Sequence, residues 1–132
     1  MTPELTALAL AAILQAGQIA LAGAAMNRDV GTAWNAGPRD SQPQFSPMTG
    51  RLRRAVDNHF EGLVFFTIAV TVVTLSGTGG HFTAACAFAY LAARILYVPA
   101  YALGWSPWRS AIWGAGFLAT MAMILTALAS SV

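Results

Sequence analysis

Four polar residues at helical spacing precede a long apolar run of the sequence. They are Arg51, Arg54, Asn58 and Glu61, and the run that follows is GLVFFTIAVTVVTL. Residues three or four apart share one face of an α-helix, so these side chains form a single stripe about three turns long. Two guanidiniums, an amide and a carboxylate beside an apolar segment are costly to desolvate, and such a cluster marks a functional site by default. The alternative is a solvated helix entrance, with Arg54 and Glu61 as surface charges.

A second polar stripe lies inside another apolar segment. Arg94, Tyr97 and Tyr101 are spaced by three and four residues and again share one helical face. An arginine this deep in an apolar helix either snorkels to the membrane surface or serves a site. The two phenols on its own stripe and the carboxylate on the first stripe favour a site. Pro99, between the tyrosines, removes one backbone hydrogen bond, which predicts a kink and an opening there.

Arg109 and Ser110 stand at the start of the last apolar segment. A guanidinium at a helix N-terminus adds to the positive end of the helix dipole, which is unfavourable unless an anion binds there. Arginines for carboxylates, a glutamate for an ammonium or amide, and an apolar wall fit glutathione together with a lipophilic electrophile. No metal site is predicted, because His59 and His81 lie far apart without companion ligands. His59 also falls off the first stripe, so packing or solvent contact is expected of it.

The composition indicates an integral membrane protein. Of 132 residues, 57% are hydrophobic and 9% are charged, whereas a soluble domain carries about a quarter charged residues. All seven cationic side chains are arginine, which suits bidentate binding of carboxylates. A net charge of +2 gives no case for nucleic-acid binding. The single cysteine, Cys86, excludes an intrachain disulfide and is expected to be a small buried hydrophobe.

Four apolar segments are long enough to cross a bilayer core of about 30 Å. The expected helices cover about residues 5–26, 51–75, 82–104 and 108–130, and a polar loop covers 27–50. The first segment is preceded by Glu4 rather than by a cation and is too long for a signal-peptide core, so we expect a retained helix. Short connections after the first loop predict an all-α, antiparallel four-helix bundle that forms a single domain, 1–132.

The placement of arginine predicts the orientation in the membrane. Arg109 lies in the last connection, the turn at 75–81 has no arginine, and the first loop is flanked by five arginines: Arg28, Arg39, Arg51, Arg53 and Arg54. By the positive-inside rule, the first and third connections are cytoplasmic and both termini lie outside. Five aromatic residues crowd the cytoplasmic boundary, and most of them are expected to form an interfacial belt: Tyr97, Tyr101, Trp105, Trp108 and Trp113.

Three motifs in this order resemble the MAPEG superfamily, the membrane-associated proteins in eicosanoid and glutathione metabolism. They are RxxRAxxNxxE at residues 51–61, ARxxYxxxY at residues 93–101 and RS at residues 109–110. The resemblance covers almost the whole chain. NRD at 27–29 and YVPAY at 97–101 look like the bacterial branch, and the chain is similar to microsomal glutathione transferases. The resemblance implies a homotrimer in the bacterial inner membrane, with glutathione bound between neighbouring subunits near the cytoplasmic side.

The resemblance also implies roles for individual residues. It places seven side chains around glutathione: Arg51, Arg54, Asn58, Glu61, Arg94, Tyr97 and Tyr101. Arg109 corresponds to the arginine that faces the thiol, and Ser110 or Tyr101 would donate a hydrogen bond to the sulfur. The family's first-helix arginine has no counterpart inside the first segment, and Arg28 follows one turn late.

These inferences predict a glutathione transferase with a role in detoxification, with peroxidase activity left open. A free thiol has a pKa of about 8.5 and is mostly protonated at neutral pH. Arg109 would lower that pKa and raise the amount of thiolate that attacks a lipophilic electrophile in the bilayer. The first alternative is a non-catalytic lipid-binding or scaffold protein of the same fold. A small transporter is a weaker alternative, because the chain has no pair of broken helices.

Overall fold

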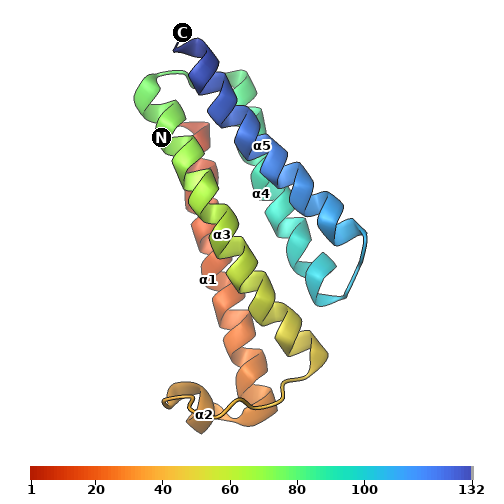
Figure 1. Ribbon diagram of the computed structural model, residues 1–132. Helices are drawn as coiled ribbons and strands as arrows, with labels where there is room; N and C mark the ends of the chain where they lie inside the picture. Colours follow the sequence, from red (N-terminus) through yellow and green to blue (C-terminus); the bar gives the residue numbers. More distant parts are fainter. Residues whose placement is uncertain (132) are drawn as a thin grey trace.

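The computed structural model describes residues 1–131 and is all-α (Figure 1). It contains four long helices, α1 (Pro3–Val30), α3 (Pro47–Ser76), α4 (His81–Ala102) and α5 (Trp108–Ser130). A short helix, α2 (Thr32–Ala36), lies in the connection between α1 and α3. All four long helices are long and apolar enough to span a membrane. The chain is therefore a multi-pass membrane protein.

The long helices pack as an antiparallel bundle (Figure 1). α1 packs against α3 and α4, and α5 packs against α3 and α4. The two chain ends and the α3–α4 turn lie at one end of the bundle, which we name the terminal end. The first turns of α3 and the α4–α5 connection lie toward the opposite end, which we name the arginine end.

Helix α1 begins at a strong capping signal and continues past the predicted boundary at residue 26. The Thr2 hydroxyl accepts a hydrogen bond from the N–H of Leu5 (3.2 Å), and Pro3 occupies the first helical position, where its missing N–H costs nothing. The helix continues to Val30 and ends at Gly31, whose φ of 88° favours glycine. Hydropathy marks where a helix leaves the apolar layer, whereas the cap decides where the helix ends.

The same distinction corrects the predicted start of α3 at Arg51. Ser46 accepts a hydrogen bond from the N–H of Thr49 (3.3 Å) and Pro47 is the first helical residue, so α3 begins four residues earlier. At the same end of the bundle, α4 ends at Ala102 rather than at residue 104, because Gly104 takes a left-handed backbone (φ 71°).

The first and third helices are longer than the apolar layer is thick. At 1.5 Å per residue, the 28 residues of α1 and the 30 residues of α3 extend about 42 and 45 Å, against a hydrocarbon core of about 30 Å. Part of each helix therefore lies outside the hydrocarbon. The first turns of α3 carry Arg51, Arg53 and Arg54, so a position outside the hydrocarbon would remove the cost of placing these charges in lipid.

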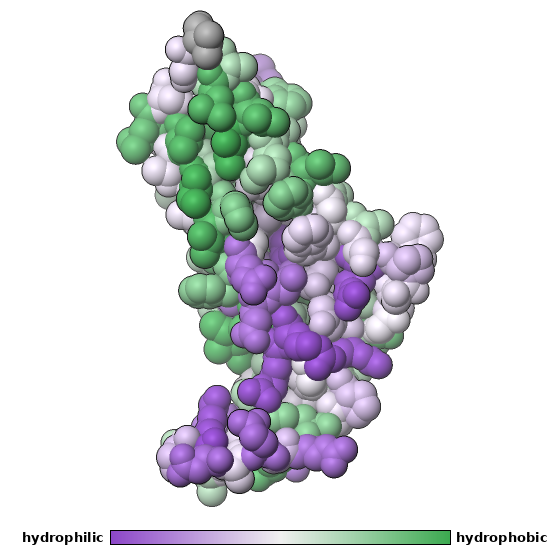
Figure 2. Space-filling model, viewed as in Figure 1, coloured by the Kyte–Doolittle hydropathy of each residue, from purple (hydrophilic) through white to green (hydrophobic). Residues whose placement is uncertain are grey.

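Two apolar clusters hold the bundle together, and the polar residues of α3 and α4 lie between them in sequence. The larger cluster, toward the terminal end, includes Phe66, Val70, Tyr90, Leu91 and Met123 together with several alanines and the buried Cys86. The smaller cluster consists of Ala22, Ala25, Leu52 and Ala102. Figure 2 shows the same division on the surface, with apolar side chains over the upper half and hydrophilic side chains gathered below them. The clusters thus fix the two polar stripes relative to each other.

Candidate functional site

Arg94 is the point at which the two predicted stripes meet. Its side chain is 3% exposed, and its Nη1 donates a hydrogen bond to Oδ1 of Asn58 (3.0 Å). Its guanidinium carbon lies 4.4 Å from the centroid of the Tyr97 ring, within the range of a cation–π interaction. The structure therefore brings Asn58 of the α3 stripe against Arg94 of the α4 stripe, so the two stripes face each other.

His59 is a further partner of Arg94 that the sequence reasoning did not assign to the site. It is fully buried, and its Nδ1 accepts a hydrogen bond from Nε of Arg94 (3.3 Å). Its other ring nitrogen lies 3.1 Å from the carbonyl oxygen of Ala11 on α1. His59 lies off the first stripe, as expected, but between three helices rather than in solvent. The sequence does not show that α1 packs against α3, and this packing is what gives His59 its second partner.

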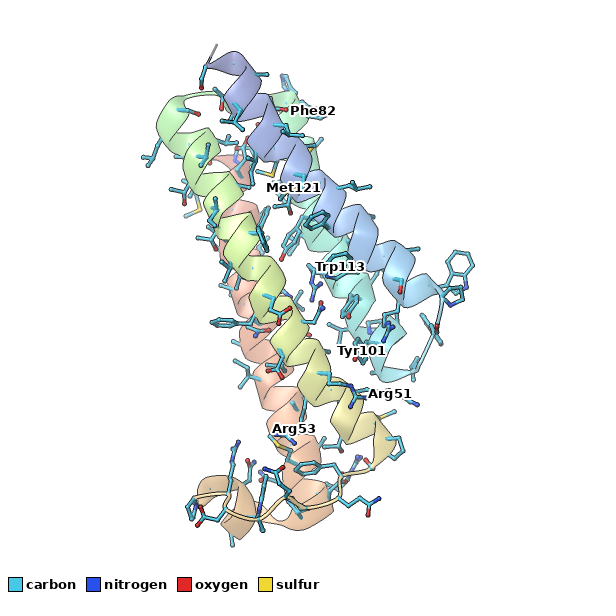
Figure 3. The ribbon with its side chains drawn as sticks, viewed as in Figure 1. Arg51, Arg53, Phe82, Tyr101, Trp113 and Met121 are labelled. Atoms are coloured by element: carbon cyan, nitrogen blue, oxygen red, sulfur yellow. The ribbon has the colours of Figure 1, made fainter. Side chains whose placement is uncertain are left out.

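Tyr101 lies between two arginines from different helices. Nε of Arg54 donates a hydrogen bond to the Tyr101 hydroxyl (3.1 Å), and the guanidinium carbon of Arg109 is 4.9 Å from the Tyr101 ring centroid. The Tyr97 and Tyr101 rings meet edge to face with centroids 5.4 Å apart. Arg51 lies one turn before Arg54 on α3, and its Nη1 donates to the carbonyl of Ala102 (3.4 Å). Figure 3 shows Arg51 and Tyr101 at the arginine end.

These side chains line a polar cleft that has two adjoining parts. One part, about 270 Å³, is lined by Asn58, Tyr97, Tyr101, Arg109, Ser110 and Trp113. The other, about 360 Å³, is lined by Arg51, Arg54, Tyr101, Gly104, Ser106 and Arg109. Because Tyr101 and Arg109 belong to both parts, we treat them as one polar cleft. It brings together residues of α3, α4 and α5.

An apolar groove meets the polar cleft at Trp113. Trp113 stacks on Phe117 (5.2 Å between centroids, planes 9° apart), and Phe65 meets Phe117 edge to face. Tyr90, Gly62 and Gly116 complete its wall, and Glu61 and Arg94 supply the polar lining. Trp113 was expected in an interfacial belt, whereas it lines both the cleft and the groove. Its position one turn after Arg109 on α5 is the sequence signal that could have identified it.

The arginines of the cleft and of the adjoining groove are not balanced by carboxylates within residues 1–131. In residues 1–131, no carboxylate lies within ion-pairing distance of Arg51, Arg54, Arg94 or Arg109. Arg94 also has one buried nitrogen, Nη2, without a hydrogen-bond partner in this part of the chain. An unpaired charge in such surroundings is costly unless a ligand compensates it. The arrangement can therefore bind an anion, or several carboxylates of one molecule, at the arginine end.

The structure separates Arg28 from the other predicted site residues. It lies in the last turn of α1, is exposed, and pairs with Asp29 (3.6 Å). It lines neither part of the polar cleft of this subunit. Glu61 is exposed at the apolar groove, beside Arg94, and Ser110 is exposed in the cleft next to Arg109. The remaining predicted residues lie together on α3, α4 and α5.

Comparison with known protein families identifies the wider group. The model of the MAPEG family matches residues 4–129. The chain belongs to the MAPEG family. This family includes glutathione transferases and peroxidases and the leukotriene and prostaglandin synthases, and most of its members are glutathione-dependent enzymes that act on lipophilic substrates. No curated protein sequence matches the chain. Membership of the MAPEG family thus confirms the resemblance seen in the three motifs, at the level of the family.

Proposed function

We propose that this MAPEG protein is a membrane-bound glutathione transferase whose site is the polar cleft together with the apolar groove. The observation that carries the proposal is the group of guanidiniums around Tyr101 and Tyr97 that has no carboxylate partner within residues 1–131. Glutathione carries two carboxylates and an ammonium group, and its reaction creates a further anion at sulfur. The anionic groups of this ligand match the sign of the uncompensated charges, and the site has a guanidinium for each of them.

The cleft suggests how glutathione is held. Arg54 and Arg51, in one part of the cleft, bind one carboxylate, and Arg94, which lines the adjoining groove, binds the other through its free Nη2. Glu61 accepts the ammonium group, and Asn58 and Tyr97 contact the peptide backbone of the ligand. The thiol then lies toward Arg109 and Ser110. Charge-assisted bonds of this kind give both affinity and a fixed orientation.

The cleft and the groove share Trp113, so a thiol in the cleft and an electrophile in the groove would lie next to each other. Arg109 lowers the pKa of the bound thiol, whose proton leaves to solvent, and Ser110 or Tyr101 donates a hydrogen bond to the sulfur. A lipophilic electrophile enters the groove from the bilayer with its apolar body against Phe117. The thiolate forms a carbon–sulfur bond to the electrophilic carbon, and the leaving group departs with the electron pair of the broken bond.

The proposal extends to assembly and orientation. The family resemblance supports a homotrimer with glutathione near subunit boundaries, in which Arg28 would belong to the site through a neighbouring subunit. The excess of arginine at the arginine end supports a cytoplasmic location of that end. In intact cells, a cysteine at Thr78 should then react with a membrane-impermeant reagent and a cysteine at Gln42 should not, both in a Cys86→Ala background. Labelling of the cysteine at Gln42 but not of the one at Thr78 would show the opposite orientation.

The decisive test is the difference absorbance of the purified protein with glutathione. A thiolate band that saturates with glutathione, and conjugation of a lipophilic electrophile, are expected. S-methylglutathione, which lacks the thiol, is the matched control: it should displace glutathione without giving a band. A protein that binds fatty acyl lipid in the groove but shows no band and no conjugation would instead be the non-catalytic lipid-binding member.

A further inference from the structure

The two ring nitrogens of His59 have opposite hydrogen-bonding roles. Nε2 lies 3.1 Å from the carbonyl oxygen of Ala11, which can only accept, so Nε2 carries the proton. Nδ1 lies 3.3 Å from Nε of Arg94, which can only donate, so Nδ1 is the acceptor. His59 is therefore a neutral imidazole in one tautomer, and it connects the backbone of α1 to the guanidinium of α4.

This connection fixes the plane of the Arg94 guanidinium. Two consecutive residues of α3 each accept one hydrogen bond: Asn58 from Nη1 and His59 from Nε. The Tyr97 ring lies against the same group from α4. The nitrogen left over is Nη2, which has no partner in residues 1–131. A planar group held at two of its three nitrogens has the direction of its third fixed, so His59 and Asn58 together aim Nη2.

Helix α1 supports this arrangement at a second place. Gln15, one turn after Ala11, is buried and donates a hydrogen bond to the carbonyl oxygen of Val56 on α3 (3.1 Å). Gln18 donates in turn to Gln15 (3.3 Å). Nε2 and Oε1 of Gln15 thus both have partners, which ties α1 to the backbone of α3. The α1–α3 interface therefore has a defined register next to His59, and the ring is held on both sides.

We infer that His59 is a positioning residue for glutathione binding: it accepts from Nε of Arg94, is braced by the Ala11 carbonyl of α1, and aims Nη2 of Arg94 at a ligand carboxylate. The inference rests on the proposed function for the identity of the ligand. It goes beyond that function in giving a role to a residue that contacts no ligand. Loss of His59 should weaken carboxylate binding and leave the thiolate-forming residue Arg109 unaffected.

Two substitutions divide the roles of the ring. His59→Asn keeps an acceptor near the position of Nδ1 and loses the reach to Ala11, whereas His59→Gln keeps a donor near the position of Nε2 and loses the acceptor for Arg94. The first measurement needs no ligand: exchange of the Arg94 Nε proton, observed by NMR on arginine-labelled protein in micelles. With only seven arginines in the chain, this signal can be assigned by substitution. Exchange should be slow in the wild type and in His59→Asn, and at least tenfold faster in His59→Gln.

The second measurement is the glutathione dissociation constant of the same proteins. His59→Gln should bind about tenfold more weakly, the size expected for loss of one hydrogen bond to a charged group, and His59→Asn within about threefold of the wild type. The thiolate band per bound glutathione should be equal in all three. In an Arg94→Ala background, His59→Gln should have no further effect on binding, because the interaction acts through Arg94.

The outcomes separate the inference from the proposed function. Equal proton exchange in both variants, or a persistent effect of His59→Gln in the Arg94→Ala background, would show that His59 has a packing role and would overturn the inference. Histidine-dependent protection of the Arg94 proton in a wild type that binds no glutathione would refute the proposed ligand and leave the positioning of Arg94 established.

Discussion

The two ends of the bundle differ in whether their buried polar groups have all their partners within the described part of the chain. At the terminal end, Glu4 is 3% exposed and accepts a hydrogen bond from the hydroxyl of Thr83, which in turn accepts from the N–H of Gly80 (2.8 Å). This network joins the first turn of α1 to the first turn of α4. A carboxylate at a helix N-terminus is also favourable toward the helix dipole. The terminal end satisfies its own polar groups.

At the arginine end, the polar groups are held in place but are not neutralised. Arg94 is buried with two nitrogens bonded and one free, and Arg54 and Arg109 approach Tyr101 without an acidic partner in residues 1–131. Hydrogen bonds to neutral groups fix a guanidinium without cancelling its charge. Burial alone is thus a poor guide to function in this bundle. The better guide is whether a buried charged group leaves a hydrogen-bonding atom without a partner. In residues 1–131, Nη2 of Arg94 is such an atom, whereas Glu4 is hydrogen-bonded to Thr83.

The largest expected effect is at Arg109. Arg109→Ala removes the charge closest to the proposed position of the thiolate, and loss of one such electrostatic partner costs roughly 10²–10³ in rate. Because the interaction is made mainly with charged sulfur, the rate should fall more than the affinity. Turnover of a lipophilic electrophile, glutathione affinity and the thiolate band are the measurements. The band should fade while glutathione stays bound.

Arg39→Ala is the matched control for Arg109→Ala. Arg39 bonds to Asn35 and lies over the Trp34 ring in the α1–α3 connection, away from the cleft. Arg39→Ala removes one positive charge, as Arg109→Ala does, but should leave turnover within about twofold of the wild type. Full activity and an unchanged band in Arg109→Ala would transfer the activating role to another residue, with Tyr101 as the first candidate.

The terminal end should respond in stability rather than in activity. Glu4→Ala removes the acceptor for Thr83, whose hydroxyl can then turn to the Gly80 carbonyl 3.1 Å away. We expect a loss of about 1–2 kcal/mol in the free energy of unfolding, read as a lower thermal midpoint in detergent, with unchanged glutathione affinity. Glu4→Gln keeps a carbonyl acceptor and should lose less. A large change in glutathione affinity with Glu4→Ala would contradict the division between the two ends.

Glu61 should have a moderate effect, confined to binding. A carboxylate at the groove meets the ligand ammonium, so Glu61→Gln should weaken glutathione binding by about tenfold, as for one hydrogen bond to a charged group. Titration calorimetry and size-exclusion chromatography would measure the affinity and the oligomer. Asp57→Asn is the control, because Asp57 is exposed on α3 and lines neither the cleft nor the groove. Equal affinity in Glu61→Gln and wild type would make the carboxylate a surface charge.

Helical periodicity predicted which side chains share a face of each helix, but not which faces meet or what supports them. The stripes on α3 and α4 need only the period of 3.6 residues, and Asn58 and Arg94 are hydrogen-bonded. The membrane character and the four long apolar helices likewise follow from composition and hydropathy. His59 could not be assigned in the same way, because its role depends on the carbonyl of Ala11, which is 48 residues away in sequence.

The hydrogen bond between Glu4 and Thr83 could not be predicted from the sequence for the same reason. These residues are 79 positions apart, and neither belongs to a periodic polar face. The helix starts at Pro3 and Pro47 differ in kind: their Thr-Pro and Ser-Pro signals are local and were present in the sequence. Short stretches of sequence are therefore enough to predict helix caps and the residues that share a helix face. Contacts that join α1 to the rest of the bundle require the packing itself.

The smallest effect is expected when the Tyr101 hydroxyl alone is removed. In Tyr101→Phe the ring remains between Arg54 and Arg109, and only the hydrogen bond from Arg54 to the hydroxyl (3.1 Å) is lost. Arg54 is exposed, so water can replace that acceptor, and glutathione affinity should fall by no more than about threefold. If Arg109 activates the thiol, the thiolate band per bound glutathione should be unchanged in Tyr101→Phe.

The matched variant for Tyr101→Phe is Tyr101→Leu, which removes the ring as well as the hydroxyl. Loss of the aromatic face should release both arginines and weaken binding by more than the hydroxyl alone, because cation–π contacts contribute about 0.5–1 kcal/mol each at exposed sites. A thiolate band that disappears already in Tyr101→Phe would instead make the hydroxyl the donor to sulfur. Arg109 would then be one of the residues that hold the ligand. In that case the arginine end would need the neutral Tyr101 hydroxyl to form the thiolate and the unbalanced charge of Arg109 to bind the ligand.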